Sequence, residues 1–196
     1  RDIYQQEQDW DKSIEICRRI ESIQAISLAP TIAQYQCEKA EAKIRNNDLK
    51  EAEVFIKQAL AEEKNCVRAS ILQARIDTRN SNFHAAISSY KHVVEQDFDY
   101  LPDIIDPLLD CCRRAGQEKE LMEFLREMLK RRTGISAMLA LAGLIRDSKN
   151  DKEAMEYVAD ELRKRPSVKG LNWLIELSMQ HSKGEAKKNL EIFHDL

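Results

Sequence analysis

The chain has 196 residues, of which 43% are hydrophobic and 33% charged, so it can form a core and is not wholly disordered. It contains only 5 glycines and 4 prolines, which argues against a strand-rich sandwich or barrel with many tight turns. The net charge of −3 excludes, by composition, a strongly basic nucleic-acid-binding protein. The abundance of Ala, Leu, Glu, Lys and Arg favours helices.

The cysteines and the chain ends say little about chemistry. The 5 cysteines are odd in number, irregularly spaced and form no C-x-x-C pair, so we expect buried, reduced thiols rather than a disulfide framework or a zinc ribbon. No apolar stretch approaches the roughly 20 residues that cross a bilayer. The chain begins with Arg1 rather than Met, and we therefore expect it to be a soluble piece of a longer protein.

Small and large residues recur at a fixed interval of 34 positions. Ala52 and Ala86 are 34 residues apart and Ala154 lies 68 further on, whereas Glu120 at the intermediate position makes one unit degenerate. Two further series share this period: Ala40, Ala74, Leu108 and Ala142, and Ile56, Tyr90, Phe124 and Val158. A period shared by several registers indicates an internal structural repeat.

Each unit has the features of a helix–turn–helix. Small residues on both sides of a turn indicate two antiparallel helices in close contact. The turns at 46–48, 80–82 and 148–151 are rich in Asn, Asp and Ser, which end one helix and cap the next. A helical unit of 34 residues is typical of the tetratricopeptide repeat. The sequence therefore predicts an all-α fold, a right-handed superhelical solenoid of antiparallel helix pairs.

The predicted domain organisation is one tetratricopeptide-repeat array over residues 1–196. A partial repeat with Tyr4 in its first helix covers 1–21, and a last helix pair with a turn at 182–184 covers about 169–196. The complete repeats cover about 33–66, 67–100, 101–134 and 135–168.

Arginines follow the same period and form the candidate partner-binding site on the concave face. A guanidinium group binds carboxylates and phosphates through its planar fork, so these residues suit an acidic or C-terminal peptide or an anionic head group. The alternative is that they close the last turns of helices, where a cation stabilises the helix dipole. The candidates are Arg45, Arg68, Arg75, Arg79, Arg113 and Arg146.

Other polar residues do not form a catalytic or metal-binding pattern. No glycine-rich phosphate loop, G-x-S-x-G elbow or H-E-x-x-H motif is present, so we predict that the chain is not an enzyme and has no catalytic residues, metal site or cofactor. The aspartates between Asp97 and Asp110 lack the spacing of a calcium loop. We interpret them as a solvated turn, with a contact surface for a basic partner as the alternative.

Four stretches together resemble one family. They are DWDKSIEICRRI at 9–20, NCVRASILQARI at 65–76, RPSVKGL at 165–171 and GEAKKNL at 184–190. Their order and spacing resemble the lipopolysaccharide assembly protein B family of Gram-negative bacteria, and the likeness spans essentially the whole chain.

This resemblance implies an adaptor at the cytoplasmic face of the inner membrane. Members of the family have an N-terminal membrane helix, a repeat array and a C-terminal rubredoxin-like metal domain, which would lie beyond Leu196. They restrain lipopolysaccharide synthesis by promoting degradation of the lipid A pathway deacetylase by a membrane-bound ATP-dependent protease, and they contact lipopolysaccharide assembly proteins. The alternatives are a generic tetratricopeptide peptide-binding scaffold and an assembly subunit that only holds a complex together.

Overall fold

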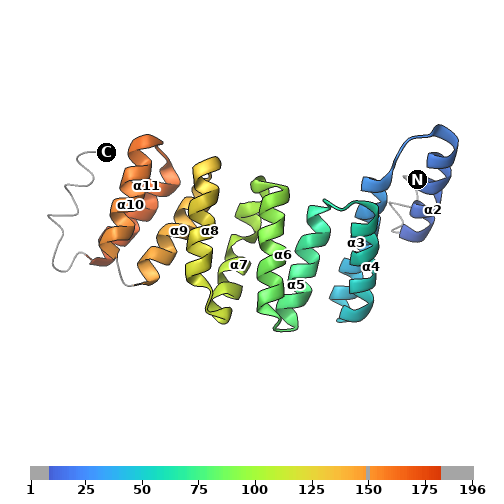
Figure 1. Cartoon of the computed structure of the whole chain (residues 1–196), viewed down its shortest axis with the longest axis horizontal. Coiled ribbons are helices and arrows are strands. Elements are labelled where there is room, and N and C mark those ends of the chain that lie inside the picture. Colours follow the sequence, from blue (N-terminus) through green and yellow to red (C-terminus); the bar gives the residue numbers. More distant parts are fainter. Residues whose placement is uncertain (1–8, 149–150, 182–196) are drawn as a thin grey trace. The chain divides into compact units, whose positions relative to one another are not determined.

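The computed structural model describes residues 9–148 and 151–181, and their regular structure is entirely helical (Figure 1). Within these ranges there are ten α-helices, one short 3-10 helix and no strand, so the predicted all-α class is confirmed. Tyr4 and the predicted turn at 182–184 lie outside the described residues. The helices are α2 (Trp10–Gln24), α3 (Ala29–Arg45), α4 (Leu49–Glu62), α5 (Val67–Arg79), α6 (Phe83–Gln96), η1 (Phe98–Tyr100), α7 (Leu101–Ala115), α8 (Glu118–Arg131), α9 (Ile135–Asp147), α10 (Asp151–Lys164) and α11 (Val168–His181).

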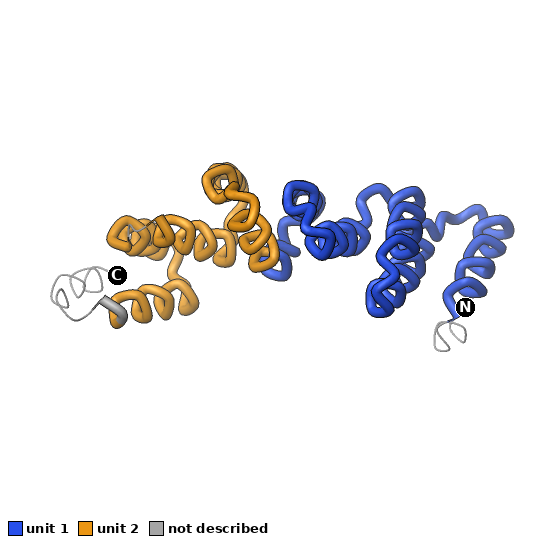
Figure 2. Tube along the Cα trace, turned by 90° about the horizontal axis from the view of Figure 1, so that it is seen from below, with its two compact units in different colours: residues 1–104 blue, residues 105–196 orange. Residues whose placement is uncertain are grey.

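The chain divides into two compact units, residues 1–104 and 105–196 (Figure 2). In the first unit α3 packs against α4, α5 packs against α6, and α3 also contacts α5. In the second unit α9 packs against α10, and α11 contacts both of them. Within each unit, a pair of helices thus packs together and contacts the first helix of the next pair, as α3 contacts α5 and α9 contacts α11, which is the contact pattern of stacked helical repeats. A single array with the predicted repeat bounds, and its superhelical hand, stay predictions.

The helix pairs repeat with the period found in the sequence. The first helices α5, α7 and α9 begin at Val67, Leu101 and Ile135, at intervals of 34 residues. None of the helices in residues 9–148 and 151–181 combines the length and the hydropathy needed to cross a bilayer.

The turns inside the pairs α3/α4, α5/α6 and α7/α8 share one geometry, which fixes how the two helices meet. Asn47, Ser81 and Gly116 adopt left-handed backbone conformations, with φ of 60°, 59° and 66°. The residue after each of them donates its backbone N–H to the carbonyl five residues earlier in the preceding helix, as in a Schellman motif. These bonds are Asp48 to Lys43, Asn82 to Asp77 and Gln117 to Cys112, at 2.9, 2.8 and 2.9 Å. Asp48 then caps α4 through its carboxylate, which accepts from Glu51 N.

The small residues of the period lie where helices touch. Ala40, Ala52 and Ala74 are fully buried in the first unit, and Ala142 and Ala154 are fully buried in the second. A methyl side chain at these positions allows neighbouring helices to approach closely, and larger residues such as Ile56 fill the space beside them.

The unit at 101–134 departs from the sequence alignment by one position. The residues of α8 that are fully buried are Leu121 and Leu125, not Glu120 and the half-buried Phe124. The reason is that α8 begins at Glu118, 35 residues after Phe83 at the start of α6. The repeat is therefore not degenerate at this point, because the buried face is kept and shifted by one residue.

Truncating a repeat-contact residue should cost far more stability than truncating an exposed neighbour on the same helix. Ile56 of α4 is fully buried, whereas Val54 is 50% exposed. We expect Ile56→Ala to lower the free energy of unfolding by about 2–5 kcal/mol and Val54→Ala by less than about 0.5 kcal/mol. Urea unfolding followed by circular dichroism measures both; equal losses would contradict the assignment of the buried face.

Candidate functional site

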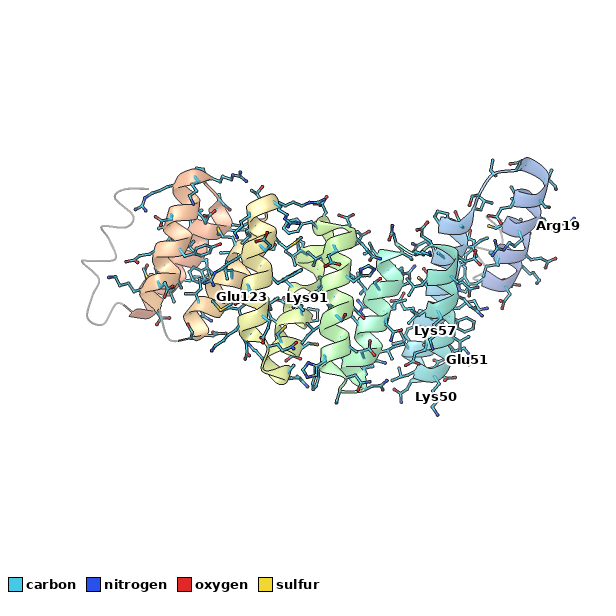
Figure 3. All side chains as sticks on the ribbon, in the orientation of Figure 1. Arg19, Lys50, Glu51, Lys57, Lys91 and Glu123 are labelled. Atoms are coloured by element: carbon cyan, nitrogen blue, oxygen red, sulfur yellow. The ribbon has the colours of Figure 1, made fainter. Side chains whose placement is uncertain are left out.

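The outward faces of the second helices carry charged side chains and leave the first helices as the candidate binding surface. In the first unit the labelled Lys57 of α4 and Lys91 of α6, which are 34 residues apart, project from equivalent positions (Figure 3). Lys50 and Glu51 of α4 are exposed at the end of the same helix. Glu51 pairs with Lys43 of α3 at 2.6 Å, so part of this charged surface is used within the helix pair.

Two of the candidate arginines lie together beside the acidic side chains of α3. Arg68 of α5 donates to Glu38 at 2.7 Å and to Glu41 at 2.5 Å. Arg75 approaches the same Glu41 at 3.8 Å. Burial alone would lower the pKa of Arg68, but the hydrogen bonds with the two carboxylates outweigh it and raise that pKa. These contacts join the first helices of successive pairs.

Arg79 also contacts the preceding pair, through a carbonyl rather than a carboxylate. Its Nη1 donates to the backbone oxygen of Ile44, in the last turn of α3, at 2.9 Å. The Ile44 carbonyl also accepts from Asn47 N at 3.1 Å, so the arginine adds a second hydrogen bond to it and stabilises the negative end of the helix dipole. Arg45 lies exposed beside it at the end of α3.

In the second unit the remaining candidates converge on one carboxylate. Arg113 of α7 donates to Asp147 of α9 at 2.6 Å, and Arg146 lies 3.6 Å from the same side chain. Asp147 stands 34 residues after Arg113, so it occupies the next position of the arginine series. Arg113 is thus paired within the chain, and binding of a partner by the six arginines stays a prediction.

A groove lies between α7 and α9, beside the Arg113–Asp147 pair. It has a volume of about 270 Å³, and we call it the α7/α9 groove. Its floor is apolar, and Asp106, Arg113 and Ser136 supply the polar groups of its rim. The residues that line it are Ile105, Asp106, Leu109, Arg113, Ser136, Leu139, Ala140, Gly143 and Leu144.

Most of these groove residues were missed by the sequence analysis, although the period contains the signal. Ile105 and Leu139 are 34 residues apart, as are Leu109 and Gly143. Residues at equal positions of successive first helices lie side by side in a repeat array, so they line the same groove. A search for equivalent half-exposed apolar positions, rather than equivalent charges, would have identified the groove.

A pair of thiols is the second feature that the sequence analysis missed. The five cysteines are buried and form no disulfide, as expected, but the Cys37 and Cys66 sulfur atoms lie only 3.8 Å apart. The hydrogen bond from Cys37 lowers the pKa of Cys66 to about 6, and backbone N–H groups at the start of α5 act in the same direction. The same contact, together with burial, raises the pKa of Cys37.

The fold defines the chain as a tetratricopeptide-like helical repeat protein. No family model matches the chain. Curated proteins, in contrast, match almost the whole chain. Lipopolysaccharide assembly protein B of Escherichia coli (strain K12) is 27% identical over 195 residues, which are 99% of this chain and 50% of that protein. The protein of the same name from Haemophilus influenzae is 25% identical over 99% of this chain and 49% of its own length. The resemblance to this family is confirmed, and the chain spans about half the length of the curated relatives it matches.

A solved structure is also similar. It contains nearly identical TPR-like repeats of a Podosopora anserina protein named as a kinesin light chain. The comparison has a TM-score of 0.47 and 20% sequence identity, and it covers 84% of this chain and 92% of that chain.

The ion pairs of Arg68 should stabilise the first unit in a salt-dependent way. We expect Arg68→Met, which keeps the aliphatic stem, to lower the free energy of unfolding by about 1 kcal/mol at low salt and by less in 1 M NaCl. Arg75→Met is the matched control, because its single contact is longer and more exposed. Urea titrations at both salt concentrations measure the effect; a loss that does not change with salt would point to packing instead.

Asp77 should make stability fall as the pH rises. This side chain is 9% exposed, and burial raises its pKa despite a hydrogen bond from Gln73. Between the unfolded value of about 3.9 and the raised folded value, the folded chain holds more protons, so its stability decreases with pH. Asp77→Asn should therefore be more stable than the parent at pH 7, with an advantage that shrinks towards pH 4. Thermal unfolding across this range measures it, with the exposed Glu123→Gln as control; a constant difference would refute the buried-charge explanation.

Proposed function

We propose that this chain is the protein-binding part of an adaptor that regulates lipopolysaccharide synthesis. In this proposal it holds the lipid A pathway deacetylase near a membrane-bound ATP-dependent protease and contacts lipopolysaccharide assembly proteins. The α7/α9 groove is the observation that supports a binding function, since it is an open apolar surface on the first helices of a repeat protein. The name of the relatives, Lipopolysaccharide assembly protein B, supports the link to lipopolysaccharide.

The proposed mechanism is proximity and needs no catalytic residue or cofactor in this chain. Within each unit the helix pairs form a firm support, because neighbouring helices are held together by buried contacts. A client bound to that support is presented to the protease at an effective concentration far above its concentration in solution. We place this event at the cytoplasmic face of the inner membrane, with a membrane anchor outside these residues.

Binding of the purified deacetylase to the full chain tests this function. We expect Leu139→Arg, which puts a charge on the apolar floor of the groove, to weaken binding at least tenfold, because the charge would have to be buried under the client. Val54→Arg is the control, since Val54 is exposed on a second helix of the other unit. Isothermal titration calorimetry measures the affinities, and circular dichroism checks that both variants fold.

Two outcomes would contradict the proposal. Equal affinities of Leu139→Arg and Val54→Arg would remove the groove from the binding site. No binding of the deacetylase by the parent chain, together with self-association in light scattering, would favour the alternative of an assembly subunit.

A further inference from the structure

We propose that the α7/α9 groove binds a peptide segment of a partner protein that carries an aliphatic side chain and, two residues away, a lysine or arginine. This inference rests on the proposed function and adds the chemistry of the segment that is bound. It differs from the prediction of an acidic ligand, which the arginine series suggested.

The charges around the groove favour a basic ligand. The two arginines of α7 are already paired, Arg113 with Asp147 at 2.6 Å and Arg114 with Asp110 at 2.9 Å. An acidic ligand would have to compete with these carboxylates. Asp106, by contrast, is exposed at the rim and has no hydrogen bond or ion pair with any residue in 9–148 or 151–181. Its carboxylate is thus available to a cation from outside.

The apolar floor lies between these two charged ends. Asp106 and Arg113 are seven residues apart on α7, about 10 Å along the helix axis, and Leu109 lies between them. Leu139 and Gly143 of α9 face the same space. In an extended peptide, side chains two residues apart point to the same side and lie about 7 Å apart. An aliphatic side chain on the floor therefore places a basic side chain two residues away within reach of Asp106.

The size of the groove fits side chains of a peptide better than a whole small molecule. Its volume of about 270 Å³ is below the range of about 300–1,000 Å³ that is usual for small-molecule pockets. One or two aliphatic side chains would fill it.

Gly143 is an independent indication that something else occupies the floor. A glycine inside a helix is unfavourable relative to alanine, so it usually has a packing reason. At Gly170 of α11 this reason is visible, because an added Cβ would lie 2.7 Å from Leu162 Cδ2. At Gly143 an added Cβ would meet no atom within 4 Å from the described residues, apart from its chain neighbours and the nearby backbone of its own helix. Packing among the described residues therefore does not require this glycine, whereas a ligand that approaches the floor closely would.

Titration of the ¹⁵N-labelled full chain with short peptides tests the proposal. Four peptides of equal length and otherwise Gly/Ser sequence carry Leu-x-Lys, Leu-x-Gln, Leu-x-Glu or Ser-x-Lys. We expect Leu-x-Lys to bind at least tenfold more tightly than Leu-x-Glu, with Leu-x-Gln between them and Ser-x-Lys weakest. The amide of Gly143 and those of the other groove residues should shift. Equal or tighter binding of Leu-x-Glu, or no shift at the groove with any peptide, would overturn the proposal.

Two variants assign the roles of the groove residues. Asp106→Asn should weaken Leu-x-Lys by up to about fivefold and leave Leu-x-Gln unchanged, whereas Asp103→Asn, one turn away and outside the groove lining, should change neither. Gly143→Ala should weaken all three leucine peptides while raising the urea midpoint of the chain. An unchanged affinity in both Asp106→Asn and Gly143→Ala would also overturn the proposal.

The outcome is separable from that of the proposed function. If Leu139→Arg abolishes deacetylase binding but Asp106→Asn affects no peptide, the binding site stands and the basic motif is wrong. If neither variant affects its ligand, both proposals fail.

Discussion

The close contact of helices at small side chains is the constraint on which the rest of this structure depends. Ala40, Ala52 and Ala74 are fully buried, and their short side chains allow neighbouring helices to pack closely. A larger residue at any of these positions would push two helices apart and misalign the next pair. Because the contact recurs every 34 residues, the turn geometry at Asn47 and Ser81 and the equivalent groove residues Ile105 and Leu139 recur with it.

Most of the fold could be predicted because its signals are local or strictly periodic. The left-handed residue in the turns after α3, α5 and α7 is Asn, Ser or Gly, which tolerate this conformation or favour turns, so the turn chemistry marks these helix ends. The exception, in the unit at 101–134, shows the limit of a fixed period. Leu121 replaces Glu120 on the buried face because the turn at Gly116 comes later, and a comparison at a rigid interval of 34 cannot follow an added residue.

The candidate site was harder to predict because equivalent residues acquire different partners from their neighbours. Arg79 donates a hydrogen bond to the backbone carbonyl of Ile44 at the end of α3, whereas Arg113 donates to the carboxylate of Asp147. A sequence series shows which residues are equivalent, but the partner of each depends on the residue one repeat further along. Extending the series by one step, to Asp147, would have revealed the charge pairing of Arg113. The thiol contact between Cys37 and Cys66 has no such periodic signal, since the two residues are 29 positions apart.

A small groove with an apolar floor and one available carboxylate suits a protein that must hold a client and then release it. An aliphatic side chain buried on such a floor contributes about 1.5–3 kcal/mol, and an exposed ion pair adds about 1 kcal/mol or less. One such contact gives only weak binding, because association also costs translational and rotational freedom. Stable capture then requires several contacts made together or confinement at a shared surface, and loss of one of them is enough to release the client. A deep, tight pocket would hold the client too long for transfer to a protease, so the shallow groove supports an adaptor of the proposed kind.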